Sequence, residues 1–128
     1  MGAFAVNKGT RVMGTCTTHL MPSGTGTGPA GPRPFSAPIS DGTIASVVIA
    51  GEPAAVINSL GYNDLPTHND IVDAPYTAPK AQIGQIKSGS ATVLIGGQAA
   101  ATINSTATCC KPAHTGKLVP GVPTVLIG

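Results

Sequence analysis

The chain has 128 residues, a formal net charge of +2 and only 9% charged residues, with no cluster of lysine and arginine. This length indicates a single domain, 1–128, and the weak charge excludes a nucleic-acid surface built on basic residues. Aromatic residues make up 3% of the chain and tryptophan is absent, so small aliphatic side chains must build the core. The 17 glycines and 12 prolines disfavour long helices.

The N-terminal segment, MGAFAVNKGTRV at 1–12, lacks the long apolar stretch of a secretory signal. The longest apolar run, IASVVIAG at 44–51, is too short to cross a bilayer as a helix. We therefore expect a chain that is made and kept as a soluble protein, without a signal peptide.

The segment at 21–42, MPSGTGTGPAGPRPFSAPISDG, is dominated by proline and glycine. Proline removes a backbone donor and glycine weakens both helices and strands, so this composition predicts a long irregular loop. A disordered linker is the alternative interpretation.

Two later segments nearly repeat one another: ASVVIAGEPAAVINS at 45–59 and ATVLIGGQAAATINS at 91–105, identical at 9 of 15 positions. A third, truncated copy, PTVLIG, occupies 123–128. Each full copy has a β-rich arm, a glycine-centred turn and a second apolar arm, which predicts a β-hairpin. Internal repeats of this kind indicate repeated supersecondary units.

The connecting segment at 60–90 holds both tyrosines and three of the five acidic residues. We expect it to be irregular, with one short helical turn. Loops of this length in a small domain usually bind, clamp or pack against something.

The histidines and cysteines lie beside the repeats rather than inside them: Cys16, His19, His68, Cys109, Cys110 and His114. An odd number of cysteines with two adjacent ones is a poor disulfide framework. Thiolate and imidazole are the ligands that structural zinc prefers, and a small core with few aromatics often needs a metal. The alternatives are solvated histidines and buried, unliganded thiols.

The copy VVIAGEPAAVINS resembles the core motif of the PAAR family, which is named for Pro-Ala-Ala-Arg. The residues at 53–55 match the motif, whereas Val56, and Thr102 in the second copy, stand where arginine is expected. The segment RVMGTCTTH at 11–19 is similar to the family's Arg-x-Gly-Asp-x-x-x-His start, with Thr15 in place of aspartate. The chain therefore looks like a divergent, PAAR-like protein.

The resemblance implies one structural zinc ion bound by three histidines and one cysteine. By position these ligands are His19, His68, Cys109 and His114. Cys110 is the alternative to Cys109, and Cys16 is a further candidate.

The fold that the resemblance implies is all-β: a small pointed cone of repeated hairpins with long glycine- and proline-rich loops. The hairpins would be arranged with pseudo-threefold symmetry, and zinc would staple the cone near its apex. The expected function is that of a non-enzymatic tip that caps the trimeric spike of a contractile injection machine. Such machines include type VI secretion systems and phage-tail-like particles.

In this role one tip binds each spike trimer, with the apolar repeat strands facing the spike, and helps to pierce the target envelope. Effector cargo is a further expected partner, and contact with the target membrane would be transient. The chain would be made in the bacterial cytoplasm, assembled into the particle and delivered with it.

Two other functions compete with this one. A Cys-His-Asp nucleophile set can be assembled from the composition, but no local motif supports it, and the glycine-rich segment at 23–31 lacks a phosphate-binding G-K-[ST]. The other alternative is a small zinc-stapled β adaptor, or cargo-binding module, outside any injection machine.

Overall fold

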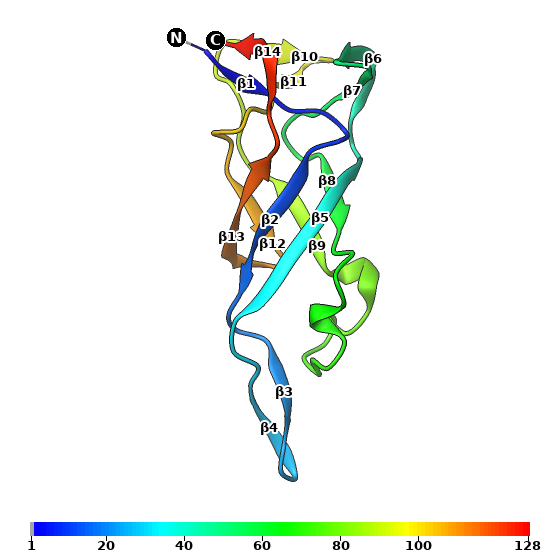
Figure 1. The fold of residues 1–128 in the computed structure, drawn as a ribbon, viewed down its shortest axis with the longest axis vertical. Coiled ribbons are helices and arrows are strands. Elements are labelled where there is room, and N and C mark those ends of the chain that lie inside the picture. The colour runs from blue at the N-terminus through cyan, green and yellow to red at the C-terminus, as the bar shows by residue number, and fades with distance from the viewer. Residues whose placement is uncertain (1) are drawn as a thin grey trace.

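The computed structural model describes residues 2–128, in which all regular structure is β-strand apart from two short 3-10 helices. The all-β prediction is therefore confirmed. Figure 1 shows an elongated molecule with ribbons and both termini at one end, a barrel in the middle and a single hairpin at the other end. No helix in residues 2–128 has the length and apolar character needed to cross a membrane.

The middle of the molecule is a closed antiparallel barrel with the strand order β12-β13-β2-β5-β8-β9. Its strands are β2 (Arg11–Cys16), β5 (Arg33–Asp41), β8 (Leu60–Tyr62), β9 (Ile83–Ile86), β12 (Ala107–Cys109) and β13 (Lys111–Val119). Inward-facing side chains such as Val12, Phe35 and Ile86 are fully or almost fully buried and fill the barrel. The barrel thus has a packed interior.

The sequence predicts an irregular loop over residues 21–42, and this prediction is wrong for most of the segment. β3 (Leu20–Ser23) and β4 (Gly26–Pro29) pair as the hairpin that projects beyond the barrel, and β5 is a nine-residue strand. Phe35, Ala37 and Ile39 recur at every second position of β5 and all face the core. These inward-facing apolar side chains stabilise β5 as a strand despite its prolines, because each proline removes only one backbone N–H donor from the sheet.

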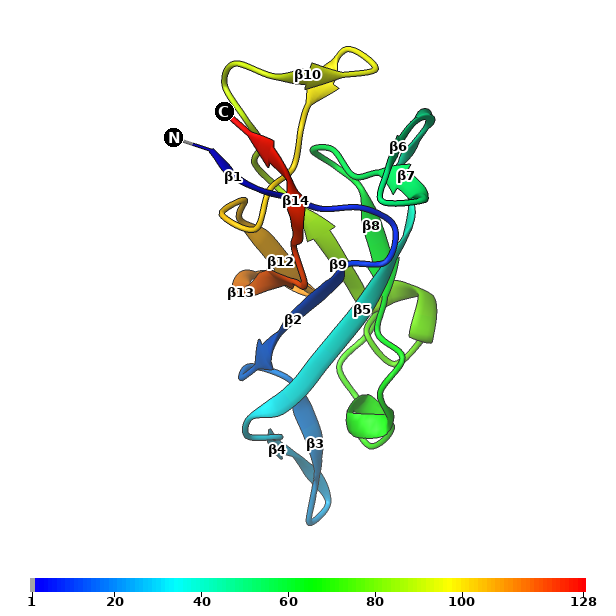
Figure 2. The same cartoon turned by 45° about the horizontal axis from the view of Figure 1, so that its top comes forward.

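Three two-stranded ribbons lie at the end opposite the β3–β4 hairpin (Figures 1 and 2). They are β6 (Ile44–Ile49) with β7 (Glu52–Ala54), β10 (Leu94–Ile95) with β11 (Gln98–Ala99), and β1 (Ala3–Ala5) with β14 (Val122–Ile127). The first two are the hairpins expected from the repeats. The truncated third copy forms a ribbon too, because its strand pairs with the N-terminal strand β1.

The segment at 2–10 takes the place of the second arm that the third copy lacks. It ends in the same kind of turn as the two full copies, in which a backbone amide donates to a hydroxyl three residues later. These bonds are Asn7 to Thr10 at 3.2 Å, Val56 to Ser59 at 3.0 Å and Thr102 to Ser105 at 3.0 Å.

A second, small apolar core lies beneath the ribbons. Ile49, Ile95 and Ile127, at matching positions of the three copies, are 6%, 9% and 8% exposed and belong to this core. The residue before each isoleucine points the other way, since side chains alternate along a strand. Accordingly, Val48, Leu94 and Leu126 are 59%, 64% and 61% exposed.

The chain between β8 and β9, residues 63–82, forms a strap along the barrel. It contains η1 (Pro66–His68) and η2 (Pro79–Ala81), so it has two helical turns where one was expected. Two ion pairs with N–O distances of 2.9 Å tie it to barrel strands, Arg11–Asp64 and Arg33–Asp70. The strap therefore has a defined position against β2 and β5.

Candidate metal centre

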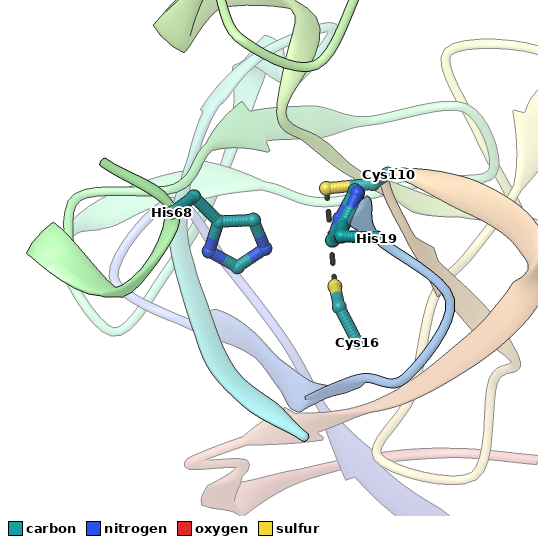
Figure 3. Close-up of side chains that lie close together, drawn as sticks. All are labelled: Cys16, His19, His68 and Cys110. Carbon is teal, nitrogen blue, oxygen red and sulfur yellow. Dashed lines mark hydrogen bonds between the residues drawn. The ribbon is translucent and has the colours of Figure 1, made fainter. Parts of the chain in front are cut away.

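Two cysteines and two histidines converge at the end of the barrel from which the β3–β4 hairpin extends (Figures 1 and 3). The residues are Cys16, His19, His68 and Cys110, and one ligand atom from each lies within 4.8 Å of all the others. Cys16 ends β2, His19 precedes β3, His68 ends η1 and Cys110 separates β12 from β13. The group thus joins three parts of the chain that are distant in sequence, at 16–19, at His68 and at Cys110.

The two thiols face one another, with 3.9 Å between the Sγ atoms of Cys16 and Cys110, and both cysteines are free (Figure 3). Cys110 adopts a left-handed backbone conformation with φ of 63°, which reverses the chain between β12 and β13. The hydrogen bond to Cys110 and burial raise the pKa of the Cys16 thiol in the metal-free protein. A bound cation would invert this preference, because a coordinating thiol is deprotonated.

His19 is fully buried and presents a free ring nitrogen to this group. Its Nδ1 lies 2.9 Å from Oδ2 of Asp73, while its buried Nε2 has no hydrogen-bond partner. Burial lowers the pKa of His19, and the Asp73 carboxylate opposes that shift without reversing it. The imidazole is therefore neutral near pH 7, which is the form that binds metals.

His68 has the same arrangement. Its Nδ1 lies 3.1 Å from the hydroxyl oxygen of Thr67, and that hydroxyl donates to the Pro34 carbonyl. The hydroxyl proton is thus engaged, so His68 Nδ1 is the donor to Thr67. Asn63 also approaches His68 Nδ1, but its amide hydrogens already have two other acceptors. The buried His68 Nε2 is left without a partner.

The donor set fits a single metal ion. Two unpartnered imidazole nitrogens and two thiol sulfurs are collected in a largely buried space, and buried polar atoms are rarely left unsatisfied without a reason. Four such donors are enough to complete a tetrahedral shell, which is the closed arrangement of a structural rather than a catalytic site. The residues can therefore hold one metal ion.

Of the four ligands expected from the sequence, the structure brings His19 and His68 together and places Cys109 elsewhere. The Cys109 thiol lies inside the barrel against the paired glycines Gly14 and Gly116. A Cβ atom at Gly14 or Gly116 would come within 2.8 or 2.7 Å of this sulfur. Burial in the barrel raises the pKa of Cys109 to about 12, so this thiol remains protonated.

The fourth expected ligand, His114, is buried beside the group but does not belong to it. Its ring centroid is 5.5 Å from that of His19. Its Nε2 accepts from the backbone amides of Thr17 and Thr18 at 3.2 and 3.1 Å, so the proton of the neutral ring resides on Nδ1. In this form His114 supports the turn after β2; its buried Nδ1 has no hydrogen-bond partner, but His114 is not among the four residues whose ligand atoms lie within 4.8 Å of one another.

Strand alternation is the signal that distinguishes the two adjacent cysteines. Ala107 and Cys109 are buried in the barrel, so the next residue must face outwards from it. Recognising β12 in the sequence would therefore have favoured Cys110 as the ligand. Alternation does not single out Cys16, because it is buried at the last position of β2 and has the same parity as the inward-facing Val12.

No protein-family model, curated protein or solved structure matches the chain. Its function must accordingly be inferred from the geometry of the metal group and of the ribbons.

Proposed function

We propose that the chain is a non-enzymatic, PAAR-like tip that caps the trimeric spike of a contractile injection machine. One tip binds one spike trimer, and the resulting point helps to pierce the target envelope. In this proposal the ion is zinc, held by Cys16, His19, His68 and Cys110 rather than by the ligand set that family position alone implies.

The observation that carries the proposal is a ring of contacts at the ribbon end. The segments at 2–10, 51–59 and 97–105 each bridge to the next at matching positions. The bridges are Asn7 with Ala54, Val56 with Ala100, and Thr102 with Ala5. Because the third bridge returns to the first segment, three similar units close on themselves, as a pseudo-threefold arrangement requires.

Backbone hydrogen bonds repeat around the same ring. In each bond the donor is the backbone amide of the residue that follows one bridge partner. The acceptor is the carbonyl of the residue that precedes the other partner of the same bridge. They are Lys8 to Pro53 at 3.0 Å, Ile57 to Ala99 at 2.9 Å and Ile103 to Phe4 at 3.0 Å. A single chain that matches a threefold partner needs this kind of internal equivalence, because each third of its surface meets an identical subunit.

The surface of the ribbons has the chemistry of a docking face. Each ribbon exposes one large aliphatic side chain at the matching position: Val48, Leu94 and Leu126. The only charged residue in the three ribbons is Glu52. A spike whose three chains end in strands could pair with these ribbons by strand addition, which would also cover their exposed edges.

The metal would stabilise the opposite, narrower end. There the chain consists of the β3–β4 hairpin, the strap and the turn between β12 and β13, which share little apolar core. Metal binding contributes folding free energy directly when a site is absent from the unfolded chain. The proposed role of zinc is thus mechanical, since it holds converging loops in a structure that must transmit force.

Reconstitution with a homotrimeric spike protein encoded near this chain would test the proposal. We expect a complex of one chain per trimer, one zinc ion per chain by elemental analysis, and loss of the complex on replacing Val48, Leu94 and Leu126 together with aspartate. Leu20→Asp, at an exposed site on the opposite hairpin, is the matched control and should leave docking unchanged. A complex with three chains per trimer, or a triple variant that still docks, would contradict the proposal; binding only to unrelated proteins would favour the adaptor.

A further inference from the structure

Outside the four-residue group, the side chain of Asp73 contacts His19 and the two residues that follow His19 and Cys110 in the chain. Three donors converge on its carboxylate: the Leu20 amide at 3.0 Å, His19 Nδ1 at 2.9 Å and Lys111 Nζ at 3.0 Å. Its side chain is only 11% exposed. The strap therefore places a well-satisfied carboxylate directly behind His19.

This geometry determines which nitrogen of His19 is free. A carboxylate surrounded by donors only accepts hydrogen bonds, so His19 Nδ1 must carry the proton and donate it to Asp73. The opposite nitrogen, Nε2, is then bare and available to the metal group. Because Asp73 also binds the amide of the following residue, Leu20, it holds both the backbone and the ring of the His19 turn.

Lys111 connects this contact to the thiol side of the group. It follows Cys110 in the chain, and its ammonium donates both to Asp73 and, at 3.0 Å, to the Thr18 carbonyl. The turn that presents Cys110 and the turn that presents His19 are thus linked through one ammonium group.

We propose that Asp73 is the positioning residue of the metal centre: it selects the Nδ1-protonated form of His19 and aims Nε2 at the ion, while Lys111 orients the carboxylate. The inference rests on the metal site of the proposed function. Groups in this outer position typically contribute 10- to 100-fold to metal affinity. The strap then supplies both a ligand, His68, and the group that orients a second ligand, His19.

Nuclear magnetic resonance of the chelator-treated protein tests the inference without any metal. Long-range proton–nitrogen spectra distinguish the two forms of a neutral histidine. His19 should be protonated at Nδ1 in the wild-type chain. Asp73→Asn should shift His19 towards a mixture, because Leu20 and His19 contact different carboxylate oxygens and asparagine replaces one of these oxygens with an amide donor. Asp70→Asn, which removes a different strap carboxylate that pairs with Arg33, is the matched control and should leave His19 unchanged.

Zinc affinity, measured by competition with a chromophoric chelator, is the second readout. We expect Asp73→Asn to weaken zinc binding by about 10- to 100-fold and Asp70→Asn to leave it unchanged. Unaltered tautomer and affinity in Asp73→Asn would overturn the inference, as would a wild-type His19 protonated at Nε2, a result that requires no folded variant. If wild-type protein bound no zinc, the metal proposal would fail, and the tautomer measurement would still decide the role of Asp73.

Discussion

The two ends of this molecule are stabilised in different ways. At the ribbon end, three similar segments satisfy one another through backbone hydrogen bonds and bury three equivalent isoleucines. At the metal end no segment repeats, and the buried groups are histidines and thiols whose free atoms point at one another. The comparison teaches that repetition can replace a large core, whereas the non-repeating end gathers donor atoms that could hold a cation.

The largest effect that would sharpen this contrast is expected at Cys110. Cys110→Ser removes a thiolate from the proposed shell, so zinc affinity should fall by more than the roughly 100-fold expected for loss of an outer partner. Zinc content and chelator competition on the purified protein measure this change.

The adjacent cysteine is the matched control for that variant. Cys109→Ser places a hydroxyl in the barrel core and should lower the free energy of unfolding, yet zinc should still bind at one ion per chain. If Cys109→Ser lost zinc and Cys110→Ser retained it, the assignment of the thiolate ligand would be wrong.

A smaller effect, confined to the ribbon end, is expected at Ile95. Truncating this buried side chain to alanine should lower the free energy of unfolding by about 2–5 kcal/mol, the range for large-to-small core changes. Leu94→Ala, one residue away but 64% exposed, should change it by no more than about 0.5 kcal/mol. Urea unfolding of zinc-loaded protein measures both, and equal losses would show that the two ribbon faces are not distinct.

The smallest effect is a pH dependence that originates at the metal end. Burial lowers the pKa values of His19 and His114 below the ordinary value of 6.5, so the unfolded chain binds more protons than the folded one just below that pH. Stability of metal-free protein should therefore fall as the pH drops from 7 towards 5, and the depressed pKa of Asp73 extends the loss below about pH 4.

Urea midpoints at pH 7 and pH 5.5 in the presence of a chelator check this expectation. His114→Asn should reduce the difference between the two midpoints, because one of the two imidazoles whose pKa values burial lowers is then gone. A midpoint that rises on acidification would indicate that the histidines gain protons on folding, contrary to their buried, neutral state.

The β class and the two full hairpins could be predicted because alternation and repetition are written directly in the sequence. The third ribbon was harder to recognise, since the segment at 2–10 shares only Gly2 and Ala5 with the copy at 51–59. What it preserves is a hydroxyl at the turn, in Thr10, and the backbone pairing, which leave little trace in residue identity. β5 was hidden for a different reason: its prolines obscured a regular inward period of two.

At the site, histidines beside the repeats were a usable signal, and His19 and His68 do meet. Choosing between Cys109 and Cys110 required knowing which side chain of β12 points into the barrel, and the composition does not reveal this. Asp73 carries no local signal at all, because it reaches His19 from 54 positions along the chain. Such a contact depends on how the strap crosses the barrel, and only the assembled fold supplies that information.

The pairing of β1 with β14 has a consequence for the order in which the molecule folds. Residues 3–5 leave the ribosome early, but their partner at 122–127 is synthesised more than a hundred residues later. Until then β1 has no strand to pair with, and the ring of bridges stays open at that position. Contacts of such long sequence separation slow folding and prolong the exposure of unpaired strands. The ribbon end is therefore the part of the molecule that the nascent chain completes last.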